Sequence, residues 1–123
     1  MTLNTKVNFL LSLQVQLKIL HWQTKGYSRH IAFGETYDEL QELIDEFVEV
    51  AMGKYERFTL TDEDKNITID NLSEVQLTKF IKDTKNTLIE MSSDFTDKDT
   101  DLSNIRDEML ALINKLSYLL TLS

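Results

Sequence analysis

The two histidines of this chain are the residues best suited to chemistry, and they lie close together in the sequence. His21 and His30 bracket the polar stretch HWQTKGYSRH. A neutral imidazole can bind a metal ion through one ring nitrogen while a neighbouring group holds the other nitrogen. The spacing predicts a metal site at the end of a helical hairpin. The alternative that the sequence leaves open is that both histidines only pack at a helix–loop–helix corner.

Acidic residues at helical spacing follow the second histidine and are the next candidates for metal ligands. Asp38, Glu42, Asp45 and Glu49 form one stripe along a helix. Carboxylates suit hard cations such as iron, manganese and magnesium. We expect Asp38 and Glu49 to contribute to the site, with Asp45 as a further candidate. The alternative is a solvated acidic face, in which like charges repel by roughly 0.2–0.5 kcal/mol per pair unless a cation or a basic partner relieves them.

Composition and motifs exclude several other kinds of site. The chain has no cysteine, so it has neither disulfides nor thiolate metal sites. It has no phosphate-binding glycine loop and no arrangement of a serine or cysteine nucleophile. The net charge of −8 opposes binding to nucleic acid or to an anionic membrane, because such binding depends on Lys and Arg. We see no secretion signal and no membrane-spanning segment, so we expect a cytoplasmic protein.

The elements that must position these residues are helices. The chain of 123 residues contains no proline and only three glycines, which favours one domain of long helices. We expect a single domain over residues 1–123. Its four helices are expected at about 2–25, 31–52, 72–94 and 100–121.

The first of these segments has a misleading local pattern. LSLQVQLKIL, residues 11–20, alternates apolar and polar residues as a half-buried strand does. Over the wider window the apolar residues cover most of a helix's circumference, which is typical of a helix buried on more than one side. We therefore predict an inner helix, with a strand as the minority interpretation, and expect one of its faces to meet a partner subunit.

The other three helices each have one apolar seam, at steps of three and four residues. The seam residues are Phe33, Tyr37, Leu40, Ile44, Phe47 and Ala51, then Leu77, Ile81, Thr84, Leu88, Met91 and Phe95, then Leu102, Ile105, Met109, Leu112, Leu116 and Leu119. Ser73 and Gln76 have the spacing of a capping box, and Gly53 is expected to stop the second helix. These features predict an all-α antiparallel four-helix bundle. The link of about 18 residues between the second and third helices could cross the length of the bundle or turn back.

The run LHWQTKGYSRHIAFGETYDELQELID resembles the metal-site region of the Dps-like branch of the ferritin superfamily. In that branch a His-Trp pair ends the first helix, a basic residue and a glycine follow, and a second histidine and an acid lie on the second helix. The residues of this chain that match are His21, Trp22, Lys25, Gly26 and Asp38. The chain is also similar to small ferritin-like proteins of bacteriophages, through Gly34–Asp38 and through Asn104–Glu108.

The resemblance implies a ferritin-like bundle in which two histidines and an acid of one subunit, with two acids of the next, bind ferrous iron and oxidise it. This sequence departs from the pattern at two positions. Gly34 falls where the family has its second histidine, so His30 would have to reach the site from one turn earlier. Of the two later acids, Glu49 is kept and Gly53 replaces the other.

Two functions are therefore expected. The first is a homo-oligomeric protein that binds iron or another divalent metal through His21, His30, Asp38, Asp45 and Glu49, with ferroxidase activity as the reaction that the resemblance implies. The second is a non-catalytic helical interaction or assembly protein, of phage origin and acting in the host cytoplasm, whose acidic face binds a basic protein. Neither function involves nucleic acid or a membrane.

Overall fold

The computed structural model describes residues 1–123, and all of its regular structure is helical. The helices are α1 (Leu3–Gln23), α2 (Tyr27–Lys54), α3 (Glu74–Glu90) and α4 (Thr100–Leu119), with a short 3-10 turn, η1 (Met91–Asp94), after α3. The segment 11–20 is helical throughout, so the minority interpretation as a strand is wrong. None of the helices is long and apolar enough to cross a membrane.

Helix α2 is longer at both ends than we expected. It begins at Tyr27 rather than near residue 31, with Gly26 as its N-cap in an extended conformation. The prediction that Gly53 stops the helix is wrong, because α2 runs through it to Lys54. Gly53 has no positive φ, so it adopts an ordinary helical conformation there. The predicted capping box is confirmed, since Ser73 and Gln76 bond each other's backbone N–H at the start of α3.

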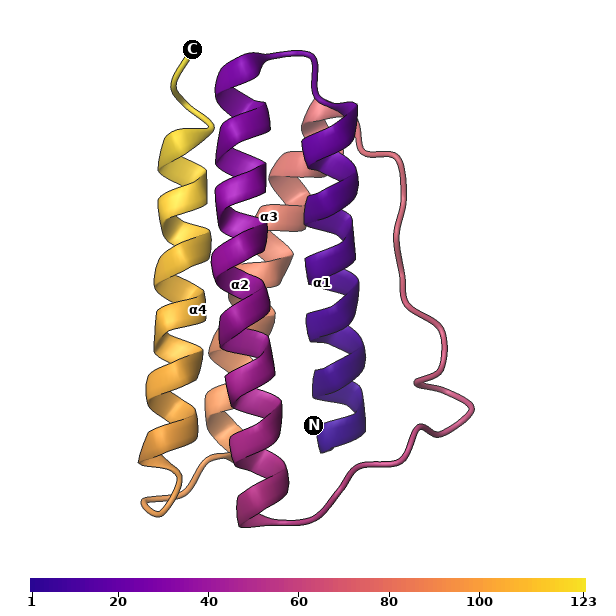
Figure 1. Ribbon diagram of the computed structural model, residues 1–123, viewed down its shortest axis with the longest axis vertical. Helices are drawn as coiled ribbons and strands as arrows, with labels where there is room; N and C mark the ends of the chain where they lie inside the picture. The colour runs from indigo at the N-terminus through magenta and orange to yellow at the C-terminus, as the bar shows by residue number, and fades with distance from the viewer.

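The long link between α2 and α3 crosses the whole length of the bundle. In Figure 1, α1 runs upward and α2 downward, the link returns along the outside of α1, and α3 then runs downward beside the upward α4. Helix α2 packs against both α1 and α4, and α3 packs against α4. The result is the crossover form of the antiparallel four-helix bundle, which is the topology of ferritin-like folds with one long connection.

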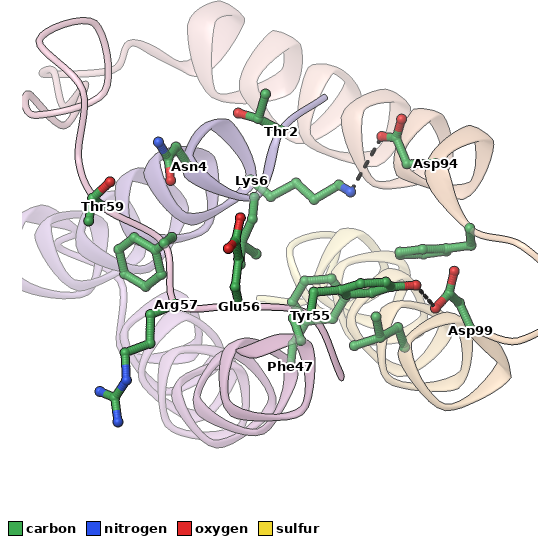
Figure 2. A pocket seen from close by; sticks show the side chains of 15 residues that line it. Thr2, Asn4, Lys6, Phe47, Tyr55, Glu56, Arg57, Thr59, Asp94 and Asp99 are labelled. Carbon is green, nitrogen blue, oxygen red and sulfur yellow. Dashed lines mark hydrogen bonds and ion pairs between the residues drawn. The ribbon is translucent and has the colours of Figure 1, made fainter. Parts of the chain in front are cut away.

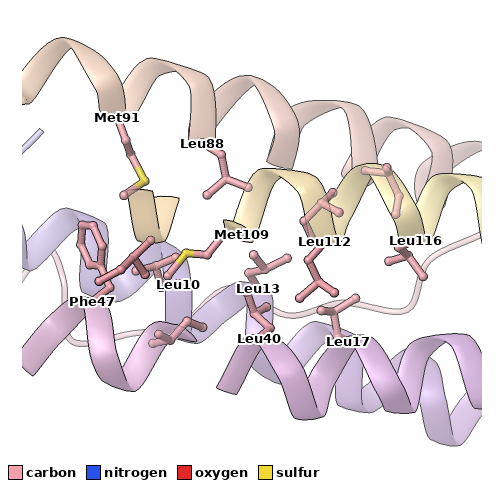
Figure 3. Packing of buried hydrophobic residues seen from close by; sticks show 14 of the residues in the cluster. Leu10, Leu13, Leu17, Leu40, Phe47, Leu88, Met91, Met109, Leu112 and Leu116 are labelled. Carbon is pink, nitrogen blue, oxygen red and sulfur yellow. The ribbon is translucent and has the colours of Figure 1, made fainter. Parts of the chain in front are cut away.

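The core lies between the four helices, and the predicted seams supply it (Figure 3). Nearly every seam residue of α2, α3 and α4 is buried, while Tyr37, Phe95 and Leu119 pack at the edge of the cluster. Helix α1 contributes Leu10, Leu13, Leu17 and Leu20. The apolar periodicity therefore predicted the buried faces correctly, because the burial of these side chains is the main favourable term in packing the helices together.

The link itself, residues 56–73, lies along α1 as a strap held by polar side chains. Asn8 donates to the carbonyls of Asp64 and Asn66, at 3.0 and 2.8 Å. Further along, Gln16 exchanges two hydrogen bonds with the backbone of Asp70, at 2.9 and 2.8 Å, as a neighbouring strand would. The strap therefore covers one polar stripe of α1 within the same chain.

Candidate metal centre

The turn between α1 and α2 brings the two histidines into direct contact. The rings of His21 and His30 are stacked, with centroids 3.8 Å apart and planes inclined by 18°. The Nδ1 atom of His21 lies 2.7 Å from the carbonyl oxygen of His30, and Nδ1 of His30 lies 2.8 Å from the carbonyl oxygen of His21. The sequence prediction that both imidazoles lie at one end of the hairpin is therefore confirmed.

These contacts fix the tautomer of both rings. A carbonyl oxygen only accepts hydrogen bonds, so each Nδ1 must carry the proton and donate it. In the neutral rings the lone pair therefore resides on Nε2. Neither Nε2 atom takes part in a hydrogen bond, and the one buried side-chain nitrogen without a partner is Nε of Arg106, so both Nε2 atoms reach solvent. Metal-binding histidines commonly show this arrangement, in which a backbone carbonyl holds the second ring nitrogen.

Gly34 allows the ring of His21 to lie against α2. A Cβ atom at this position would be 2.8 Å from Cε1 and 2.9 Å from Nδ1 of His21. Such distances are well inside van der Waals contact, so no residue larger than glycine fits here without moving the imidazole. The glycine at position 34 thus leaves room for the stacked pair.

The carboxylates predicted to join the site are not brought to the histidines within one chain. Asp38, Asp45 and Glu49 are exposed on α2, and none of them forms an ion pair. No group of three or more His, Cys, Asp or Glu side chains is placed to hold a metal ion. The rise along a helix explains this, because Asp38 lies about 12 Å beyond His30 and Glu49 lies about 28 Å beyond it.

A second polar cluster, which the sequence analysis missed, lies at the other end of the bundle. Asp99 is 2% exposed, accepts from the Tyr55 hydroxyl and from the backbone N–H of Thr96 at 3.0 Å, and pairs with Lys54 at 3.4 Å. The Tyr55 hydrogen bond is the main cause that lowers the pKa of Asp99 to about 2. The carboxylate is therefore ionised and fully engaged at neutral pH.

The sequence carried little signal for this cluster. Asp99 directly precedes α4, as a capping aspartate would, but its side chain accepts from Thr96 and makes no cap hydrogen bond to the helix. Its partner Tyr55 is 44 positions away in the chain, and no local pattern connects the two.

Comparison with known proteins relates the chain to a protein family. No curated protein and no solved structure matches the chain. Residues 21–120, which begin at His21 and include all of α2, α3 and α4, match the family of unknown function DUF5856. The chain therefore belongs to the DUF5856 family.

Proposed function

We propose that this protein binds a divalent metal ion, iron foremost, at the stacked pair of His21 and His30, and that carboxylates of a second copy complete the site. The observation that carries the proposal is the shared tautomer, because it leaves a lone pair on each solvent-accessible Nε2. Imidazole nitrogen together with carboxylate oxygen is a donor set that iron accepts. The two rings supply part of this set, and within one chain no acid joins them to form a group of three ligands.

A two-fold pairing of α2 helices would bring the missing acids to the histidines. In an antiparallel pair of identical helices with the axis near the level of Asp38, His30 of one copy lies level with Asp45 of the other. On a helix, Asp38, Asp45 and Glu49 lie within about 100° of the direction of His30, so one face presents them all. The proposed site therefore requires at least two copies of the chain.

Ferrous iron would be the substrate of such a site. Two imidazoles and one or two carboxylates leave coordination positions open on the ion. Dioxygen or hydrogen peroxide from solution would be the oxidant, and it would take up the one electron that each ferrous ion loses on becoming ferric. The chain's own contribution is to hold both rings in one tautomer and orientation through the two backbone carbonyls. We propose ferrous oxidation as the reaction on this basis.

The test is anaerobic equilibrium dialysis with ferrous ion, using variants that separate ligand from structural roles. His21→Asn and His30→Asn each keep a side-chain N–H that can donate to the opposite carbonyl, as Nδ1 does, but remove the Nε2 lone pair. We expect stoichiometric binding by the natural protein and its loss in both variants, with unchanged helicity. Gln14→Ala, on the same helix as His21, is the matched control and should bind as the natural protein does.

Two results would refute the proposal. One is negligible binding by the natural protein, and the other is equal binding by the Asn variants. Sedimentation with and without the ion tests the second copy directly, because a shared site requires that the ion favour the larger species.

A second function is supported by a different surface. Glu39, Glu42, Glu46 and Glu108 line a groove of about 470 Å³ between α2 and α4, with Lys115 as its one cation. None of these glutamates forms an ion pair. Such a groove favours a basic protein segment, as the interaction-protein hypothesis requires. Salt-sensitive capture of a partner without metal, lost in Glu42→Gln/Glu46→Gln, would support this function, and capture that depends on metal would contradict it.

A further inference from the structure

A cavity of about 430 Å³ lies at the end of the bundle away from the histidines (Figure 2). It is open to solvent and is lined by the first turn of α1, the last turns of α2, the start of the strap, and the segment from Asp94 to Leu102. This volume is in the range of sites that hold small organic molecules. Neither the histidine pair nor the acidic groove shares a residue with this cavity.

Lys6 is the unusual residue of the cavity wall. It lies on α1 and is only 8% exposed, whereas lysine is rarely buried. Its ammonium lies 5.3 Å from the centre of the Phe95 ring and 3.5 Å from a carboxylate oxygen of Asp94. A charge-assisted hydrogen bond is shorter, at about 2.7–2.9 Å, and an ammonium has three donors. Lys6 therefore has hydrogen-bonding capacity that the protein itself does not use well.

The other buried charge of the cavity offers no such capacity. Asp99 already accepts hydrogen bonds from Tyr55 and Thr96 and pairs with Lys54. Figure 2 shows the Tyr55 hydroxyl turned to Asp99 and the Lys6 side chain extended across the wall toward Asp94. Lys6 is thus the one buried charged group here whose donors can serve a ligand.

The rest of the wall is apolar and aromatic. Phe47 and Phe95 meet at a ring-centroid distance of 6.2 Å, and Leu3, Ala51 and Leu102 surround them. Flat hydrophobic surface of this kind favours a ligand with an apolar body. An inorganic anion would leave this surface uncovered. The carboxylates of the wall do not favour an organic cation, because each already has a cationic or hydrogen-bonding neighbour. Asp94 is shared between Lys6 and the N-terminal ammonium, and Asp99 is engaged by Tyr55, Thr96 and Lys54. At the exposed edge, Glu56 is followed directly by the opposite charge of Arg57.

We propose that this cavity binds a small organic carboxylate, with its carboxylate on Lys6 and its apolar body against Phe47, Phe95 and Leu102. Charge selects the head group through Lys6, and the aromatic wall selects the body. This binding site is independent of the metal site, so either proposal can fail without the other.

The probes are benzoate, benzyl alcohol and benzylamine, added to the isotopically labelled protein and followed by amide chemical shifts at constant ionic strength. We expect benzoate to shift the amides around Lys6, Tyr55 and Phe95, with an affinity at least tenfold above that of the alcohol. Lys6→Met should lower the affinity for benzoate to that for benzyl alcohol. Lys18→Met is the matched control, since Lys18 also lies over aromatic rings, those of Trp22 and Tyr37, but is outside the cavity. It should leave benzoate binding unchanged.

A second variant guards against loss of the fold in Lys6→Met. Ala51→Leu keeps Lys6 but puts three more carbons at the cavity wall, and it should weaken benzoate and the alcohol alike. The proposal is overturned by equal shifts with benzoate and benzylamine, by equal shifts with inorganic phosphate, or by undiminished benzoate binding in folded Lys6→Met.

Discussion

Gly34→Ala tests whether the stacked histidine pair exists as described. Helix α2 gains about 1 kcal/mol when an interior glycine becomes alanine, and Gly34 has no positive φ that would oppose the change. The new Cβ, however, would lie 2.8 Å from the ring of His21 and must displace it. Displacement of the ring breaks the 2.7 Å hydrogen bond to His30, and this loss lowers the free energy of unfolding by about 0.5–1.5 kcal/mol. A forced side-chain torsion adds a similar amount.

The magnitude is best isolated by a double-mutant cycle with His21→Ala. In the natural background, the gain in helix propensity is offset by the broken hydrogen bond and the forced torsion. The free energy of unfolding should therefore stay level or fall by up to ~2 kcal/mol. In the His21→Ala background the ring is gone, and the same alanine should stabilise by about 1 kcal/mol. The coupling between the two sites is therefore expected at roughly 1–3 kcal/mol.

The assay is urea unfolding followed by far-UV circular dichroism, for the four proteins of the cycle at one protein concentration. Gly53→Ala is the control, because a Cβ there meets nothing within 4 Å, and its effect should be the same in both backgrounds. Additivity of Gly34→Ala and His21→Ala within about 0.5 kcal/mol would refute the close packing of imidazole on α2.

Three further predictions concern the rest of the chain. Gln16→Leu should remove both hydrogen bonds to the strap and destabilise by about 1–3 kcal/mol, with faster hydrogen exchange over residues 64–71. Ser73→Ala should cost about 1 kcal/mol of unfolding free energy, measured by thermal unfolding, because it removes the capping box of α3. Asp99, with its pKa lowered to about 2 from 3.8, stabilises the fold above pH 3.8 and loses this contribution as pH falls toward 2. Tyr55→Phe removes the main cause of that shift and should flatten the acid limb of a stability–pH curve.

Each of these predictions has an opposite outcome that can be observed. Unchanged exchange in Gln16→Leu would mean that the strap does not depend on Gln16. A melting temperature unaffected by Ser73→Ala would mean that the cap contributes nothing. Identical acid limbs for Tyr55→Phe and the natural protein would mean that the hydroxyl does not hold Asp99 in its ionised form.

Features set by neighbouring residues could be predicted from the sequence, and contacts between residues far apart in the chain could not. The seams of α2, α3 and α4 follow a period set by one helix, so residues such as Leu40 and Met109 could be assigned to the core from local pattern. The strap could not be assigned in this way, because Asn8 and Gln16 meet segments more than 50 positions away.

The candidate site was predicted only in part for the same reason. Proximity of His21 and His30 follows from a short turn between two helices, and the sequence shows that turn. Their stacking and their tautomers depend on which carbonyl each Nδ1 reaches, and no spacing rule contains that information. The acids were predicted from helical spacing and from the family resemblance, and the rise of the helix places Asp38 and Glu49 too far along α2 to meet the rings in one chain.

The reciprocal hydrogen bonds make a structural role and a ligand role compatible rather than competing. The two Nδ1–H groups join the end of α1 to the start of α2, and this function uses neither Nε2. A metal ion would use only Nε2, and it would find both rings already oriented, so little conformational entropy would be lost on binding.

Ion binding to the folded protein alone must also stabilise it against urea, by an amount that grows with the ion concentration. If the histidine pair only joins the two helices, the stability against urea should not depend on the ion concentration. Unfolding at increasing ferrous concentration, in the natural protein and in His21→Asn, therefore separates the two roles without any assay of iron oxidation.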